Sequence, residues 1–156
     1  MQVQLESPDQ PDVIQLIAEL DAYQHSLYPP ESVYALDLAA LKAPQVLFAV
    51  ARDAAGRALG CGAVVLGAGF GELKRLYVHP DSRGRGTAAR LLALLETRAA
   101  DAGCRELMLE TGPYQTEALA FYAKSGYRRR GPFGDYRDDP YSVFMHKPLP
   151  APPSHA

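Results

Sequence analysis

The 156-residue chain lacks the features that mark several specialised classes of protein. It has only two cysteines, Cys61 and Cys104, which are too few for a disulfide framework or a four-ligand zinc site. We therefore expect two small buried thiols in a reducing cytoplasm and no metal centre. No apolar run reaches the roughly 18–20 residues that a membrane span requires. The opening stretch, MQVQLESPDQ, also lacks the basic and apolar regions of a signal peptide.

An excess of positive charge is missing too, because the net charge is −2 and the isoelectric point is about 6.1. The chain therefore has no global attraction to nucleic acid or to an anionic membrane, and we expect neither as a partner. Hydrophobic residues make up 47% of the chain, which is ordinary for a globular protein with a sizeable core. We expect a single domain over residues 1–149, followed by a disordered, proline-rich tail over 150–156.

Hydrophobic periodicity and turn residues predict strands and helices without an internal repeat. Strands are expected over residues 2–6, 46–53, 58–66, 72–78, 105–111 and 142–149, and the arginine run 128–130 is expected to begin another. Asp12 is the expected cap of a helix whose apolar stripe ends at Leu20, and Ser32 the expected cap of a short helix ending before Pro44. Two further helices are expected over 87–102 and 116–126. The fold class is therefore α+β or mixed α/β, and not a regular doubly wound fold.

The sequence RGRGTA, residues 83–88, joins a predicted strand to the helix that follows. The first turn of a helix has backbone N–H groups without internal partners and carries a positive partial charge. Gly84 and Gly86 allow the backbone to approach a ligand closely, and Arg83 and Arg85 add mobile positive charge at the rim. The stretch is therefore a candidate site for a diphosphate group, with a glycine turn beside solvated arginines as the alternative.

Two other phosphate-binding motifs are missing at this junction. The Gly-Lys-Ser/Thr end of the Walker phosphate loop does not occur there. GAGFGE, residues 67–72, only approximates the dinucleotide-binding fingerprint, because its last glycine comes one position early and an apparent strand follows it. A nicotinamide-dependent oxidoreductase is the alternative that this stretch leaves open.

Two blocks of the sequence resemble the GCN5-related N-acetyltransferases, the GNAT family. The first is a strand ending in Leu-Tyr-Val, a His-Pro-Asp turn and then Arg-x-x-Gly-x-Ala, in which Arg83, Gly86 and Ala88 occupy the specified positions. The second, QTEALAFYAKSGY at 115–127, resembles the Asn-x-x-Ala-x-x-Phe-Tyr…Gly-Tyr helix of many members. Gln115 stands where Asn is usual. The resemblance runs over nearly the whole chain and ends at residue 149.

The resemblance implies a mixed, mostly antiparallel sheet of roughly six or seven strands, flanked by about four helices, with a splayed strand pair that binds acetyl-CoA. It implies that the backbone amides of residues 83–88 hold the pyrophosphate of coenzyme A. It also implies that the strand end 76–78 hydrogen-bonds the pantetheine arm. The cofactor-binding residues expected on this basis are Leu76, Tyr77, Val78, Arg83, Gly84, Arg85, Gly86, Thr87, Ala88 and Gln115.

Acetyl transfer from a thioester to an amine needs a neutral amine and a proton for the departing thiolate. The resemblance places Tyr122 at the position of the general acid and Glu72 at that of the general base. Packing in the core is the alternative for Tyr122, and an ion pair with Lys74 or Arg75 is the alternative for Glu72. Glu110, at the end of the next strand, is a second candidate for the base, and bulk water is the alternative when the amine is small and exposed.

Two loops are candidates for an acceptor pocket. LYPPES, 27–32, lies between the first helices, where the family builds this pocket, and 131–149 resembles a small bacterial branch with a Pro-Phe-Gly-x-Tyr motif. We expect an aromatic wall and carboxylates for an ammonium ion, with a solvated turn over 131–142 as the alternative. The expected substrate-binding residues are Tyr28, Glu31, Glu110, Phe133 and Tyr136, with Asp135 as a further acid.

The sequence therefore predicts an acetyl-CoA-dependent N-acetyltransferase that acts by direct attack, with a tyrosine as general acid. The expected acceptor is the amine of a small molecule or an amino acid. A protein-lysine acetyltransferase and a non-catalytic sensor of coenzyme A are the alternatives. The resemblance also allows a homodimer, although no stretch of the sequence identifies an interface.

Overall fold

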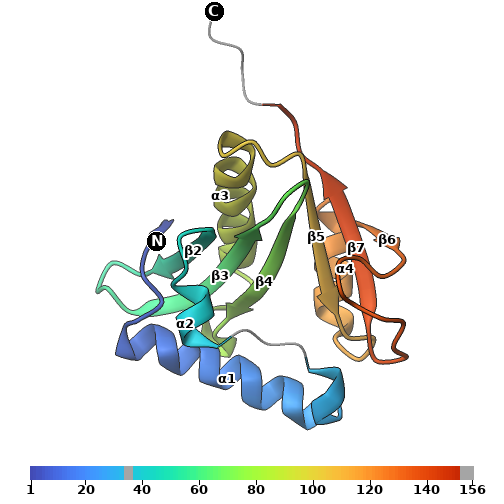
Figure 1. Ribbon diagram of the computed structural model, residues 1–156. Helices are drawn as coiled ribbons and strands as arrows, with labels where there is room; N and C mark the ends of the chain where they lie inside the picture. Colours follow the sequence, from blue (N-terminus) through green and yellow to red (C-terminus); the bar gives the residue numbers. More distant parts are fainter. Residues whose placement is uncertain (34–36, 152–156) are drawn as a thin grey trace, which may run out of the picture.

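The computed structural model describes residues 1–33 and 37–151 (Figure 1). Over these residues a seven-stranded sheet has the order β1-β2-β3-β4-β5-β7-β6. The strands are β1 Gln2–Leu5, β2 Val46–Arg52, β3 Ala58–Leu66, β4 Gly71–Val78, β5 Glu106–Thr111, β6 Arg128–Arg130 and β7 Val143–Pro148. The helices are α1 Pro11–Leu27, α2 Leu38–Leu41, α3 Thr87–Asp101 and α4 Thr116–Lys124, with 3₁₀ helices at Pro30–Ser32 and Pro80–Ser82. Most of the predicted tail, residues 152–156, lies outside the described residues.

Helices α1 and α3 cover opposite faces of the sheet (Figure 1), so β2 and β3 are buried on both sides. Alternate residues of β2 accordingly face different cores, with Ala49 and Ala51 toward α3 and Phe48 and Val50 toward α1. Among the described strands only β4 and β5 pair in parallel, and the mixed, mostly antiparallel sheet expected from the sequence is confirmed. None of the described helices combines the length and the apolarity that a membrane crossing demands.

The first helix is longer than its apolar stripe predicts, and its cap differs from the prediction. Helix α1 begins at Pro11 with Gln10 in the N-cap position, so Asp12 lies in the first turn and does not cap the helix. Proline suits this position because its missing N–H would have no partner inside the helix. The helix continues to Leu27 and ends before the proline pair that cannot extend it.

The prediction that Ser32 caps a helix is also wrong. Ser32 is the last residue of the first 3₁₀ helix, and its hydroxyl donates to Asp139 Oδ2 at 2.7 Å. The next helix, α2, is capped by Asp37, whose Oδ1 accepts a hydrogen bond from the Ala40 N–H at 2.8 Å. Residues 34–36, which the prediction placed in the same helix, lie outside the described residues.

The parallel pairing between β4 and β5 ends early. Residues Gly71–Leu73 pair with Leu107–Leu109, and no pair follows although both strands continue. Beyond this point β4 follows β3 and β5 follows β7, so the two strands diverge (Figure 1). The divergence coincides with an irregularity in β4, where Arg75 has a φ of 60° and the register with β3 shifts. The splayed strand pair expected from the sequence is therefore present.

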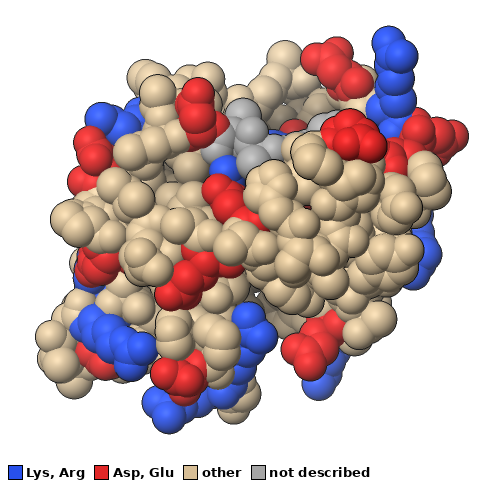
Figure 2. All heavy atoms as spheres, turned by 90° about the horizontal axis from the view of Figure 1, so that it is seen from below, with Lys and Arg blue, Asp and Glu red and all other residues tan. Residues whose placement is uncertain are grey.

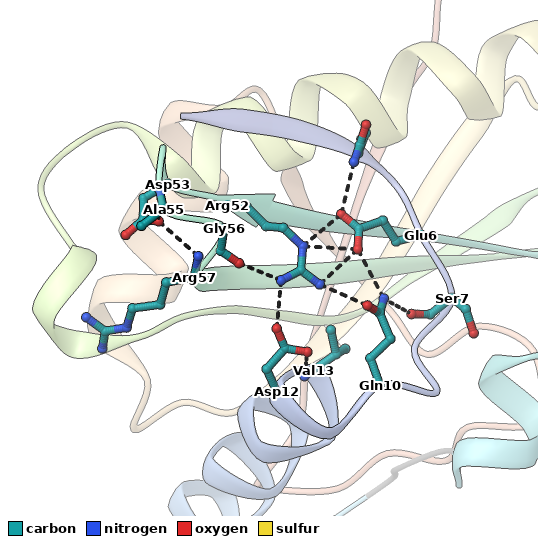
Figure 3. A network of polar contacts seen from close by, with 11 residues as sticks. Glu6, Ser7, Gln10, Asp12, Val13, Arg52, Asp53, Ala55, Gly56 and Arg57 are labelled. Carbon is teal, nitrogen blue, oxygen red and sulfur yellow. Dashed lines mark hydrogen bonds and ion pairs between the residues drawn. The ribbon is translucent and has the colours of Figure 1, made fainter.

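Arg52, the last residue of β2, joins three segments of the fold (Figure 3). Its guanidinium donates to both carboxylate oxygens of Glu6 at 2.9–3.1 Å and to Asp12 Oδ2 at 2.6 Å. It also donates to the carbonyl of Gly56 at 2.8 Å and to Gln10 Oε1 at 3.1 Å. Burial alone would raise the pKa of Glu6, but the hydrogen bonds from Arg52 lower it, and they lower the pKa of Asp12 as well. The network ties the start of α1 to the β2–β3 hairpin.

Replacing Arg52 by methionine should lower the free energy of unfolding by about 2 kcal/mol at neutral pH, because two carboxylates lose their cation. The depressed pKa values mean that this stabilisation is present above the ordinary carboxyl range and is lost as pH falls through the depressed values. The difference between the two proteins should therefore shrink from about pH 7 to about pH 3 in urea unfolding.

Arg57→Met is the matched control, because the side chain of Arg57 forms an exposed ion pair with Asp81 at 3.9 Å. Its effect should stay below about 0.5 kcal/mol. Equal losses in the two variants would contradict the role given to Arg52.

Candidate active site

A cavity opens where β4 and β5 diverge. Its walls come from both strands, from the second half of α1 and the 3₁₀ helix after it, from α4, and from the loop between β6 and β7. The structure brings together here six residues that the sequence singled out for catalysis or binding. These are Tyr28, Glu72, Leu76, Glu110, Gln115 and Tyr122.

Glu72, at the start of β4, is held by two neighbours. Its Oε2 accepts a hydrogen bond from the Tyr136 hydroxyl at 2.5 Å and forms an ion pair with Lys74 Nζ at 3.1 Å. Lys74 also donates to the Tyr136 hydroxyl at 2.9 Å, so the three side chains contact one another. Glu72 thus lies in the cavity wall as the partner of a cation, which is the alternative that the sequence left open.

Glu110, near the end of β5, is the second carboxylate of the cavity. Burial raises the pKa of Glu110 to about 7, and the carboxylates of Glu72 and Asp139 act in the same direction. The Ser142 hydroxyl and the Lys74 ammonium act against this rise. Unlike Glu72, Glu110 forms no ion pair with any residue that the structure describes. It therefore has the affinity for a proton that a general base needs near neutral pH.

Tyr122 belongs both to the core and to the cavity wall. Its ring is 9% exposed and contacts Phe121 and Tyr127, with centroids 5.6 and 5.8 Å away. The residue also lines the cavity from α4. Burial raises the pKa of the Tyr122 phenol above its ordinary value, so the hydroxyl keeps its proton at neutral pH. A protonated phenol at this place has the form that a general acid requires.

The segment 83–88 forms an exposed turn that leads into α3. Gly84 and Gly86 have φ values of 79° and 76°, and Gly86 is the N-cap residue of the helix. A β carbon at either glycine would meet nothing within 4 Å, so the turn faces open space. The N–H groups at the start of the 15-residue α3 have no partners within the helix, and the helix end carries a positive partial charge. These residues therefore fit the pyrophosphate of coenzyme A.

The two arginines of this turn differ. Arg83 folds back, because its Nε donates to the Val78 carbonyl at 3.1 Å and its guanidinium lies 5.8 Å from the centroid of the Tyr77 ring. It fixes the turn to the end of β4 and is not the mobile rim charge that was predicted. Arg85 is exposed, and Thr87 is buried at the start of α3.

The end of β4 carries three predicted residues in different surroundings. Leu76 lines the cavity, whereas Val78 is buried in the core against α3. The hydroxyl of Tyr77 donates to Glu19 Oε2 of α1 at 3.2 Å. Strand β5 does not pair with this end of β4. The backbone of β4 on that side can therefore form hydrogen bonds with a pantetheine arm.

Gln115, in the position where the family usually has Asn, stabilises the turn after β5. Its Oε1 accepts hydrogen bonds from the Gly112 N–H at 3.2 Å and from Thr111 Oγ1 at 3.4 Å. The turn lies directly against Tyr28, since a β carbon at Gly112 would be 1.8 Å from the Tyr28 hydroxyl. Glycine is therefore required at residue 112 for Tyr28 to hold its place.

The predicted aromatic wall is divided between two places. Tyr28 lines the cavity; its hydroxyl accepts from the Tyr114 N–H at 3.1 Å, and the two rings stack with centroids 5.6 Å apart. Tyr141 also lines the cavity and meets both rings edge-on, at 6.2 and 6.1 Å. Phe133, in contrast, packs against Phe144 in a separate core cluster and does not line the cavity.

The remaining acceptor residues also divide. The hydroxyl of Tyr136 donates a hydrogen bond to Glu72. Glu31 and Asp135, in contrast, are exposed and do not line the cavity, contrary to the prediction. Tyr114 and Tyr141 are not among the predicted residues, although each tyrosine of the cluster with Tyr28 has a proline beside it in a loop. That repeated Pro–Tyr pairing was the available signal.

The face of the molecule seen from below carries acidic side chains in its middle and at its edges, and basic ones lie mainly at the edges (Figure 2). Two cations line the cavity, and each has an acidic partner. Lys74 pairs with Glu72, and Arg75 pairs with Asp21 of α1. Residues 1–33 and 37–151 contain no group of three or more His, Cys, Asp or Glu side chains arranged to hold a metal ion.

Diverging parallel strands, a glycine-rich turn at a helix N-terminus and a cavity holding a carboxylate and a phenol define an acyl-CoA-dependent transferase. The sequence profile of the Acetyltransferase (GNAT) family matches residues 13–127. The chain belongs to this family, as its two motif blocks predict. It is an N-acetyltransferase, and acetyl-CoA is the cofactor of the family.

Three relatives illustrate the range of similarity. IAA acetyltransferase of Azospirillum brasilense is 49% identical over 146 residues, which are 92% of this chain and 95% of that protein. A Klebsiella pneumoniae structure, described as an acyl-CoA N-acyltransferase, is 40% identical with a TM-score of 0.81 and covers 95% of this chain and 97% of its own. The PaiA N-acetyltransferase of Thermoplasma acidophilum, solved with coenzyme A, shares the fold at 18% identity, with a TM-score of 0.69 over 96% and 100% of the two chains.

Gly86→Ala should weaken the binding of coenzyme A by at least about tenfold, because a side chain at positive φ displaces the amides of the turn. The strain itself should cost about 1 kcal/mol of unfolding free energy. Calorimetric titration with coenzyme A measures the first effect, and urea unfolding measures the second.

Gly69→Ala is the matched control, since Gly69 also has positive φ and open space around a β carbon but lies in the turn between β3 and β4. It should lose similar stability and bind coenzyme A normally. Unchanged affinity in Gly86→Ala would show that the pyrophosphate is held elsewhere.

Proposed function

We propose that the chain transfers the acetyl group of acetyl-CoA to the amine of a small molecule or a free amino acid. The observation that carries this proposal is the contact between two segments that line the cavity. Ser32, after α1, donates to Asp139 of the β6–β7 loop at 2.7 Å, and the rings of Tyr28 and Tyr141 are in contact. A protein-lysine acetyltransferase needs an open groove for the peptide on both sides of the lysine. Among the described residues these contacts join the two segments, which favours a small acceptor over a peptide.

In this proposal Glu110 is the general base. It lines the cavity, and burial brings its pKa to about 7, so it can accept a proton from the acceptor ammonium near neutral pH. Glu72, the base expected from the sequence, already shares its charge with Lys74 and its oxygen with Tyr136. We therefore give Glu72 the role of holding Lys74 beside the cavity.

Tyr122 is the proposed general acid. When bound, acetyl-CoA supplies an acetyl group activated as a thioester, whose departure leaves a thiolate. The Tyr122 hydroxyl keeps its proton in the buried wall and can donate it to that leaving group. The cavity wall thus provides a base for the amine and an acid for the sulfur.

We further infer that residues 1–149 act as one domain in the cytoplasm. The main core includes residues from Val3 to Leu149, which makes one unit of both halves of the sheet. Burial raises the pKa of the Cys61 thiol to about 12, so this cysteine stays protonated and inert. Both cysteines are free thiols, as a reducing compartment would keep them.

Glu110→Gln should lower kcat/KM by about 10²- to 10⁴-fold, because an amide cannot take the proton of the amine. In the unaltered enzyme kcat/KM should rise as pH passes through about 7, since the base works in its deprotonated form. In the variant kcat/KM should no longer rise through this pH range. The measurement is the rate of thiol release from acetyl-CoA as a function of pH. Glu117→Gln, on the exposed side of α4, should keep the rise. Loss of the rise in Glu72→Gln alone would return the role of base to Glu72.

Tyr122→Phe should lower kcat by about 10²-fold while the affinity for coenzyme A stays the same. The loss should be smallest at high pH, where the thiolate leaves without a proton. Tyr23→Phe, at a 45% exposed tyrosine of α1, is the control and should be neutral. A loss of equal size at every pH would indicate that Tyr122 serves packing only.

A further inference from the structure

We infer that the acceptor is an aromatic amine whose amino group sits on a short alkyl arm and has no carboxylate beside it. This inference rests on the proposed function and narrows its substrate class. It excludes free amino acids as the preferred acceptors. Three features of the cavity support it: its cations are paired with acids, its carboxylate Glu110 has no ion pair among the described residues, and part of its lining is aromatic.

The cations of the cavity are already engaged. Lys74 Nζ lies 3.1 Å from Glu72 Oε2 and 2.9 Å from the Tyr136 hydroxyl, and its side chain is only 14% exposed. The Arg75 guanidinium pairs with Asp21, and its side chain is 6% exposed. A substrate carboxylate would have to compete with Glu72 or Asp21 for a cation that is largely buried with its acid, which is unfavourable. The cavity therefore offers poor recognition of the carboxylate of an amino acid.

One acid of the cavity, Glu110, is in a different state. Glu110 has no ion-pair partner among the described residues, and Asp139 lies close enough to raise its proton affinity. A bound ammonium group offsets the repulsion that Glu72 and Asp139 exert on Glu110, whereas a carboxylate on the carbon that bears the ammonium would add to that repulsion. The charge pattern thus selects a cation and disfavours a zwitterion.

The rim of the cavity is aromatic. Tyr28 and Tyr141 line it with ring centroids 6.2 Å apart, and Tyr114 stacks on Tyr28 while remaining 57% exposed. Such rings favour offset or edge-on packing with another aromatic group. Tyr28 and Tyr141 line the same cavity as Glu110, so the ring of an acceptor can contact the two tyrosines while its amine points toward Glu110.

Matched acceptor pairs test the inference on the unaltered enzyme. Phenethylamine and phenylalanine, and likewise tryptamine and tryptophan, differ only by the carboxylate. We expect kcat/KM to be at least tenfold higher for each amine than for its amino acid, and higher for phenethylamine than for hexylamine. Equal or better use of the amino acids, or no preference for the ring, would overturn the inference.

Asp21→Asn tests the specificity directly, because a general loss of activity lowers kcat/KM for both members of a pair and leaves their ratio unchanged. The substitution releases the Arg75 guanidinium from its acid, so the ratio of kcat/KM between phenethylamine and phenylalanine should fall several-fold. Glu19→Gln removes a charge from the same helix without touching that pair and should leave the ratio unchanged. Tyr141→Leu should narrow the advantage of phenethylamine over hexylamine. If Asp21→Asn does not fold, the matched pairs decide alone.

The same measurements separate this inference from the function beneath it. Acetylation of other amines, but of neither phenethylamine nor tryptamine, overturns the inference and leaves the proposed function standing. Binding of coenzyme A without acetylation of any amine or amino acid overturns both.

Discussion

The cavity depends on the early end of pairing between β4 and β5. Two strands that stayed hydrogen-bonded to their ends would leave no space between them and would bury the backbone that follows Leu73. The irregularity at Arg75 turns β4 toward β3, while β5 remains on β7. The parallel register then sets Lys74 and Glu110 just past the last pair, on either side of the opening. One interruption in strand pairing thus supplies both the space and its charged walls.

The same geometry separates two carboxylates that look alike in the sequence. Glu72 lies on the paired part of β4, within reach of Lys74 and Tyr136, so its charge is balanced. Glu110 lies where pairing with β4 has ended, and burial raises its pKa to about 7. Different surroundings give two identical groups different tasks, one electrostatic and one able to exchange a proton.

Features encoded by neighbouring residues were predictable from the sequence. The turn 83–88 is one, because two glycines before an apolar helix are enough to specify it. The strands and helices were predictable for the same reason. Ser32 was misjudged because its hydroxyl is used by Asp139, more than a hundred residues away. The meeting of the three tyrosines and the contact of Glu72 with Tyr136 also depend on segments distant in the sequence, whereas the pair of Glu72 with Lys74 is local and was one of the expected alternatives.

The contact between Gly112 and Tyr28 constrains how this enzyme can change over evolutionary time. Any side chain at residue 112 collides with the phenol of residue 28, whereas a smaller residue at 28 collides with nothing. Mutations at this edge of the cavity must therefore occur in one order, with residue 28 shrinking first. A lineage that shifts to a bulkier acceptor can replace Tyr28 by a smaller residue, but it cannot replace Gly112 while Tyr28 is present.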